Sequence, residues 1–226
     1  GVSPGATDDL LAACAEAGTD YVDLCGEPSW MAEMIPAYEA KAKASGARIV
    51  FSCGFDSIPS DLGVLFLQDK AKVKFGHTLP NVKARVRKMR GTFSGGTAAS
   101  FGETMKAAGK NPDLLKVLMN PHALAGGEGT PQPHAHKPMH DDELGVWLAP
   151  FIMESINSKN VHRSNALLRG AYGDDFTYHE MMVTGPGEKG EQIANGIASV
   201  NPMAGKDAPK PGEGPDKEER ENGFYD

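Results

Sequence analysis

The sequence has little of what would mark a membrane, secreted or nucleic-acid-binding protein. No apolar run approaches the ~20 residues of a membrane-spanning helix, so we expect no transmembrane segment. The first residues are small and polar, without the basic start of a secretory signal. Three cysteines in 226 residues are too few and too widely spaced for a disulfide framework or a zinc site, which favours a cytoplasmic protein. The net charge of −7 argues against a nucleic-acid partner.

What the chain does have is a strand, a turn and a helix in close succession over residues 47–67, ARIVFSCGFDSIPSDLGVLFL. Ala47–Ser52 is apolar and rich in β-branched and aromatic residues, which predicts a strand with both faces covered. Gly54 permits the sharp turn that follows. Asp56 and Ser57 are expected to cap the next helix with their side-chain oxygens, and the apolar residues beyond them predict that this helix is mostly buried.

The residues before this stretch repeat the same alternation. Helical spacing around Leu10–Ala15, a strand over Thr19–Leu24 and a helix over Ser29–Ser45 give the order α-β-α-β-α, which implies a parallel sheet covered by helices. Ligands bind beyond the carboxyl ends of such strands, where the turns at Gly26 and Gly54 would lie. A capped turn with no ligand is the alternative. Two strands are too few for such a sheet, so we expect further strands upstream of residue 1.

The pattern changes after Lys70. Val82–Met89 alternates apolar and basic residues, as a half-exposed strand does, and Phe176–Val183 predicts another strand. In this second strand Tyr178 and Glu180 share one face, and His179 and Met181 share the other. Helices are predicted over 97–108, 111–124 and 188–200. Residues 201–222 are expected to be extended or disordered, and a new apolar element begins at 223.

Two polar clusters in this part are candidate ligand-binding sites. Imidazoles and carboxylates gather at His134, His136, His140, Asp141 and Asp142. They are metal-ligand types, but a loop broken by proline offers no rigid element to hold them, so we expect no metal. The glycine-rich turn over 91–97 opens a helix and could bind an anion, or it could simply let a strand and a helix pack closely.

Six segments spread over nearly the whole chain match one known family in its own order. They are GTDYVDLCGEPSWMAEMI, SGARIVFSCGFDSIPSDLGVLFLQ, GTFSGGTAAS, PFIMESINSKNVHRSNALL, YGDDFTYHEMM and PGEGPDKEERENGF. Through them the chain resembles the saccharopine dehydrogenase-like oxidoreductases, a group that includes the trans-acting enoyl reductases of lipid biosynthesis.

The resemblance implies an α/β fold in two parts. Residues 1–72 would be the C-terminal part of a Rossmann-like NAD(P)-binding domain, with a partial parallel sheet. Residues 73–226 would be an α+β substrate and dimerisation domain with a mixed or antiparallel sheet, ending in an extended or disordered tail over 201–226. No strand–GxGxxG–helix unit occurs, so the phosphate-binding half would lie upstream of Gly1. The chain is therefore expected to be a fragment that also lacks the extreme C-terminus.

The same resemblance implies the chemistry and the site. The full-length protein would use NAD or NADP to reduce an enoyl or carbonyl group of a small-molecule or acyl-lipid substrate, and it would pair as a homodimer. The fragment alone would bind no cofactor and be inactive. Candidate residues are Glu27, Asp56 and Ser57 for catalysis, Cys53, Gly54 and Phe55 for the cofactor, and Gly95, Gly96 and Thr97 for the substrate. The alternative is a non-catalytic interaction or dimerisation module that keeps the family fold.

Overall fold

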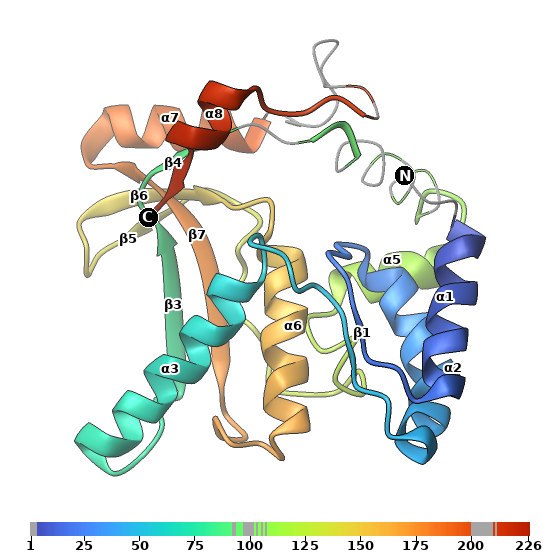
Figure 1. Cartoon of the computed structure of the whole chain (residues 1–226). Coiled ribbons are helices and arrows are strands. Elements are labelled where there is room, and N and C mark those ends of the chain that lie inside the picture. Colours follow the sequence, from blue (N-terminus) through green and yellow to red (C-terminus); the bar gives the residue numbers. More distant parts are fainter. Residues whose placement is uncertain are drawn as a thin grey trace.

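The structure of the chain is a computed structural model that describes residues 4–91, 94–96, 102, 104, 106, 108–199, 210 and 212–226. Figure 1 shows two groups of elements: helices with two short strands on one side and a larger sheet with its own helices on the other. None of the helices in these described ranges is long and apolar enough to cross a membrane.

The first group alternates helices and short strands. Its elements are α1 (Pro4–Ala17), β1 (Tyr21–Val22), α2 (Pro28–Ser45), β2 (Ile49–Val50) and α3 (Ile58–Phe75). β1 and β2 pair in parallel, with Tyr21 opposite Ile49 and Val22 opposite Val50. The predicted α-β-α-β-α order is confirmed. The sequence predicts a kink or a restart of the helix at Pro36; α2 runs through this proline to its end, so it does not restart there.

Both long helices end at a glycine in the left-handed conformation. Gly46 follows α2 with φ +84°, and Gly76 follows α3 with φ +79°. Each glycine N–H donates to a carbonyl four residues earlier, at Ala42 and Lys72. These positions need glycine because other residues rarely adopt a positive φ. The chain can therefore turn sharply from α2 into β2 and from α3 toward the second sheet.

The predicted burial of the first sheet is wrong. Val22 and Val50 are 68% and 50% exposed, because the sheet described here has two strands and no helix covers its outer face. α3 is also exposed along one side, at Leu62, Phe66 and Val73. Only its Val64, Gln68 and Ala71 are buried, on the side that faces α6 and the second sheet.

The second sheet has four strands in the order β3-β7-β6-β5. Its strands are β3 (Asn81–Val86), β5 (Met139–Asp141), β6 (Val146–Pro150) and β7 (Thr177–Gly185). β3 and β7 are parallel, whereas the other two pairs are antiparallel, so the sheet is mixed, as predicted. The α/β class is confirmed, and the parallel pair beside a separate mixed sheet is consistent with a partial Rossmann-like sheet followed by a second unit.

One face of this sheet carries the main core. Helix α6 (Glu154–Leu167) and α3 pack on it, and the buried residues there are Val64, Val82, Val161, Tyr172, Phe176 and Tyr178. Met181 packs on the opposite face with Leu148 and Ala135. The predicted alternation along this strand is therefore confirmed. Helix α7 (Gly187–Ser199), also predicted, packs against β6 and β7.

The end of the chain is more ordered than its composition suggests. Asp216 and Glu219 form a capping box for α8 (Lys217–Asn222), and β8 (Phe224–Tyr225) pairs antiparallel with β4 (Met89–Arg90). The expectation of an extended or disordered segment is therefore wrong for 217–222, because the capping box satisfies the free N–H groups of the helix start. The predicted apolar element at 223 is confirmed as β8. Helix α5 (Pro112–Met119) is shorter than the predicted 111–124.

Candidate functional site

Asp23 organises the carboxyl ends of β1 and β2. Its carboxylate accepts hydrogen bonds from the backbone N–H of Ser52 (2.9 Å), from that of Cys25 (2.9 Å) and from the Tyr21 hydroxyl (3.0 Å). Ser52 is held at φ +56°, a conformation that is uncommon for a residue other than glycine. Its hydroxyl donates to the Cys25 carbonyl (2.6 Å). The residues that follow both strands are thereby fixed relative to one another.

Glu27 and Asp56 follow β1 and β2, and both lie within electrostatic range of the Cys25 thiol. Burial raises the pKa of the Cys25 thiol to about 12, and the negative charges of Asp23, Glu27 and Asp56 contribute to the rise. The charges of these three carboxylates therefore all act on one thiol. Glu27 is the residue that precedes α2, and it makes no side-chain capping bond. Sequence reasoning missed Asp23, although an acidic residue at the end of the strand-like run TDYVDL was a signal for it.

The capping role expected of Ser57 is wrong. Ser57 precedes α3, but its hydroxyl makes no capping hydrogen bond and is buried with no hydrogen-bond partner among the residues that the structure describes. The backbone takes over this function, because the N–H groups of Ser57 and Ile58 both donate to the Gly54 carbonyl. Asp56 is exposed and lies close to Gly54, where a Cβ atom would overlap its carboxylate.

The residues predicted for the cofactor follow β2, and those predicted for the substrate follow β4. Phe55 is 71% exposed, and its ring meets that of Tyr225 edge-on at 5.7 Å between centroids. The Cys53 thiol lies 3.5 Å from the Val50 carbonyl. Gly95 is buried beside the C-terminal segment and donates its N–H to Glu213 O (3.0 Å). Gly96 is exposed, and Thr97 lies outside the described residues.

A pocket of about 250 Å³ lies between α3 and the second sheet, next to this edge. α3 contributes Ser60, Val64 and Leu67, and β7 contributes Tyr178 and Glu180. β3 contributes the apolar residues Val82 and Ala84 and the charged residues Lys83 and Arg85, and Tyr225 of β8 completes the lining. The lining therefore combines apolar groups with polar and charged ones.

Glu180 is the polar centre of this pocket and is 1% exposed. Its carboxylate accepts hydrogen bonds from the Ser60 hydroxyl (2.9 Å) and from the Asn157 amide (2.8 Å). Burial raises the pKa of Glu180, while hydrogen bonds from the surrounding side chains oppose the rise. Tyr178 lies beside it, fully buried, with a hydroxyl that has no hydrogen-bond partner among the described residues. The sequence predicted that Tyr178 and Glu180 share a face but did not mark them as a site.

Helix α6 places a second ionisable pair behind Glu180. Burial raises the pKa of Glu154 to about 7, and the nearby Glu180 adds to the rise. Burial lowers the pKa of Lys159 to about 8, against the attraction of Glu154. The Lys159 ammonium donates to the carbonyls of Leu118 (2.8 Å) and Ser155 (2.7 Å). These bonds anchor it in the interior, away from the pocket lining.

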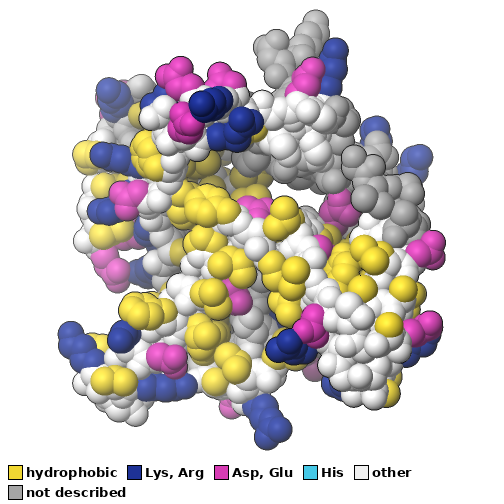
Figure 2. All heavy atoms as spheres, in the orientation of Figure 1, with side chains coloured by type: hydrophobic (Ala, Val, Ile, Leu, Met, Phe, Trp, Pro, Cys, Tyr) yellow, Lys and Arg dark blue, Asp and Glu magenta, His cyan; other side chains and the backbone are white. Residues whose placement is uncertain are grey.

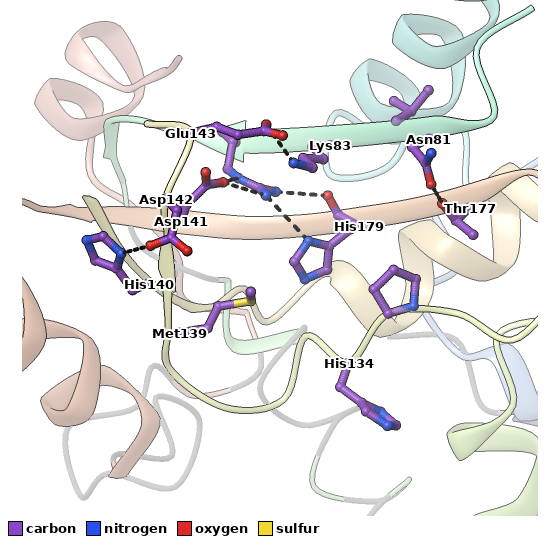
Figure 3. A pocket seen from close by; sticks show the side chains of 13 residues that line it. Asn81, Lys83, His134, Met139, His140, Asp141, Asp142, Glu143, Thr177 and His179 are labelled. Atoms are coloured by element: carbon purple, nitrogen blue, oxygen red, sulfur yellow. Dashed lines mark hydrogen bonds and ion pairs between the residues drawn. The ribbon is translucent and has the colours of Figure 1, made fainter. Parts of the chain in front are cut away.

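A larger hollow of about 410 Å³ lies on the opposite face of the second sheet (Figure 3). Its central ion pair joins Arg85 to Asp141 (3.0 Å), with both side chains largely buried. Arg85 also donates to the His179 carbonyl (3.2 Å). Figure 3 shows His134 and His140 pointing in different directions, and His140 pairs with Asp142 (2.7 Å). Within the described ranges no three histidine, cysteine or acidic side chains converge as metal ligands would.

Comparison with known proteins finds close relatives over almost the whole chain. A Mycobacterium tuberculosis protein described provisionally as a trans-acting enoyl reductase is 40% identical over 241 residues, which cover 96% of this chain and 58% of the relative. Trans-acting enoyl reductases of Mycobacterium ulcerans and Mycobacterium bovis are 35% and 32% identical over 242 residues, with the same shares covered.

The chain thus spans 58% of the length of each of these relatives. No family model matches the chain, and no solved structure matches it. The similarity supports an enoyl reductase-like family, and the chain is a homologue of the trans-acting enoyl reductases over nearly all of its own length.

Proposed function

We propose that this protein belongs to the saccharopine dehydrogenase-like oxidoreductases and reduces the carbon–carbon double bond of an enoyl substrate with NADH or NADPH. The observation that carries the proposal is the 40% identity, over 96% of the chain, to a relative described as an enoyl reductase. A lipid-like acyl chain is the substrate class that we propose, and the pocket beside Glu180 offers it the apolar groups of Val64, Leu67 and Val82. A homodimer belongs to the same proposal.

The residues at the carboxyl ends of β1 and β2 fit the nicotinamide end of such a cofactor. Leu24 and Phe55 are 74% and 71% exposed there, and they offer apolar surface to a flat ring. Cys53, Gly54 and Phe55 would hold the ring, which supplies a hydride when bound. The 226 residues contain no strand–GxGxxG–helix unit to grip the pyrophosphate. We therefore expect weak or no nucleotide binding by these residues alone.

The carboxylates at this edge would orient the reacting groups. Glu27 and Asp56 lie near Cys25 at the ends of adjacent strands, where they flank the proposed ring site. The pocket beyond Tyr225 would hold the acyl part, with Ser60 and Glu180 among its polar groups. Hydride transfer needs both partners face to face, and holding them in that geometry can contribute several kcal/mol, of order 7–11, to lowering the barrier.

The test is an assay of the complete gene product that contains this chain. The protein is mixed with NADH or NADPH and an α,β-unsaturated acyl thioester, and the loss of reduced nicotinamide is followed together with the saturated product by mass spectrometry. Glu27→Gln and Asp56→Asn should each lower turnover by about tenfold or more without changing the melting temperature. Glu33→Gln, at an exposed position of α2, is the matched control and should keep full activity.

Two results would contradict the proposal. Unchanged rates in both carboxylate variants would remove these residues from the site. No turnover and no nucleotide binding by the complete gene product would favour a non-catalytic interaction module with this fold.

A further inference from the structure

We infer that Tyr225 is the proton donor of the pocket between α3 and the second sheet, and that the Glu180 carboxylate positions its phenol. The inference rests on the proposed function and names a catalytic residue for it. Tyr225 lies in β8, far along the chain from every other residue of the pocket.

Backbone hydrogen bonds fix β8 beside the pocket. Asp226 O accepts from the N–H groups of Arg87 (2.6 Å) and Lys88 (3.2 Å), and Asp226 N–H donates to Lys88 O (2.8 Å). An ion pair between Arg87 and Asp226 (2.7 Å) adds to them. Tyr225 is paired with Met89 in the same short ladder. The phenol is therefore carried by a defined strand.

The ring of Tyr225 connects the two halves of the site. On one side it meets Phe55, which follows β2 and borders the proposed ring site, at 5.7 Å between centroids. On another side it meets Phe151, which follows β6, at 6.2 Å. The phenol lines the pocket and lies beside the Glu180 carboxyl, and each group shifts the pKa of the other. Tyr225 thus stands between the proposed hydride source and a buried acid.

Reduction of an enoyl thioester leaves an enolate that must take up one proton at its α-carbon. In the proposed step the O–H bond of Tyr225 breaks, and the enolate electron pair forms the new C–H bond with that proton. The phenolate then regains a proton from solvent that reaches the open pocket, and the Glu180 carboxylate holds the phenol in place throughout. Burial and the adjacent Glu180 raise the pKa of Tyr225 to about 12, so the phenol keeps its proton at neutral pH until a stronger base such as the enolate arrives.

Tyr178 is the rival donor, because its hydroxyl also lies beside Glu180. Tyr178 is 1% exposed and its hydroxyl oxygen is inaccessible, whereas Tyr225 is only half-buried. A substrate in the pocket can therefore reach the Tyr225 oxygen without opening the core. Ser60 and Asn157 already donate to Glu180 and hold the carboxyl toward this side.

The experiment compares Tyr225→Phe with Tyr172→Phe in the complete gene product. Tyr172 is a matched control, since it is a buried tyrosine with an unpartnered hydroxyl that does not line the pocket. Tyr225→Phe should lower kcat by about a hundredfold to ten-thousandfold with little change in KM, whereas Tyr172→Phe should keep it. A Tyr225→Phe protein that melts like the wild type and keeps more than a tenth of the wild-type kcat would overturn the inference.

A second readout does not depend on turnover. In protein labelled with carbon-13 at the tyrosine ring carbon that bears the hydroxyl, Glu180→Gln should move the Tyr225 signal and leave the Tyr172 signal in place. The same variant should also flatten the pH dependence of kcat. An unmoved Tyr225 signal would show that the two groups are not coupled. If the wild-type protein shows no enoyl reduction, the proposed function is wrong. If the wild type is active and the Tyr225→Phe variant has the same kcat, only this inference is wrong.

Discussion

Glu154 shows how burial, helped by the nearby Glu180, can raise the pKa of a carboxyl group to near neutrality. The side chain is 8% exposed, and its pKa rises from an ordinary 4.5 to about 7. Between these two values the folded protein holds a proton that the unfolded chain has already released. The free energy of unfolding must therefore fall as the pH rises through this window, and by about 3 kcal/mol if the full shift is realised.

We predict that Glu154→Gln removes this fall in the free energy of unfolding with rising pH. Gln stays neutral, so the difference in unfolding free energy between variant and wild type should grow in favour of the variant from pH 5 to pH 7. Urea denaturation at several pH values measures it. Glu33→Gln, on the exposed side of α2, should follow the wild-type curve. Parallel curves for Glu154→Gln and the wild type would mean that the buried carboxyl does not carry the shift.

For individual residues, the sequence predicted the direction of a side chain better than it predicted the hydrogen-bond partner. The alternation in β7 correctly separated Tyr178 from Met181, because strand geometry leaves no other choice. The cap by Ser57 failed because the Gly54 carbonyl already accepts both N–H groups at this helix start. The gathering of Ser60, Asn157 and Tyr225 around Glu180 joins four elements distant in the chain, and no local pattern indicates such a contact.

The junction of β7 and α7 is an element held by close backbone contact. The strand ends at Gly185 with φ +112°, and Gly187 follows at φ +63°, so the chain reverses within three residues. Gly190 then lies directly on this turn, where a Cβ atom would overlap the carbonyl oxygen of Gly185. Because the obstructing atom belongs to the backbone, no side-chain rotation can relieve the overlap.

Gly190→Ala should therefore destabilise the protein by about 1–3 kcal/mol, as other overpacked sites do. Gly196 of the same helix supplies the control, since a Cβ atom there would meet nothing within 4 Å. Gly196→Ala should stabilise the protein by about 0.5–1 kcal/mol through helix propensity. Thermal or urea unfolding of the two variants measures both effects, and equal stabilities would contradict the contact.

Among the secondary-structure elements, the helices were easier to predict than the strands. α2 and α7 begin and end at or near the predicted positions. β1 and β2 were predicted as six-residue strands and pair over two residues each, because pairing needs a neighbour, and the sequence of one strand does not reveal whether a neighbour is present. The capping box of α8 was readable at Asp216 and Glu219, but the charged and proline-rich context outweighed it.

Across the whole molecule, apolar surface is concentrated on the first group of elements. Figure 2 shows hydrophobic side chains gathered in the middle of the drawn face, around α3 and α6. The large exposed side chains include Val22 and Leu24 around β1, Phe55 after β2, and Phe66 and Val73 on α3. Exposed apolar area of this extent, beside a parallel strand pair with an open edge, favours association.

The 226-residue chain produced by itself should therefore self-associate. We expect the mass measured by light scattering to rise with protein concentration, and an apolar fluorescent dye to bind the folded protein. Val22→Lys places a charge on the exposed side of β1 and should reduce both effects without lowering the melting temperature, because Val22 is 68% exposed. Lys43→Arg, on the exposed side of α2, should leave association unchanged. A concentration-independent monomer with no dye binding would show that this surface is tolerated in water, and the apolar faces of β1 and α3 would then need no partner.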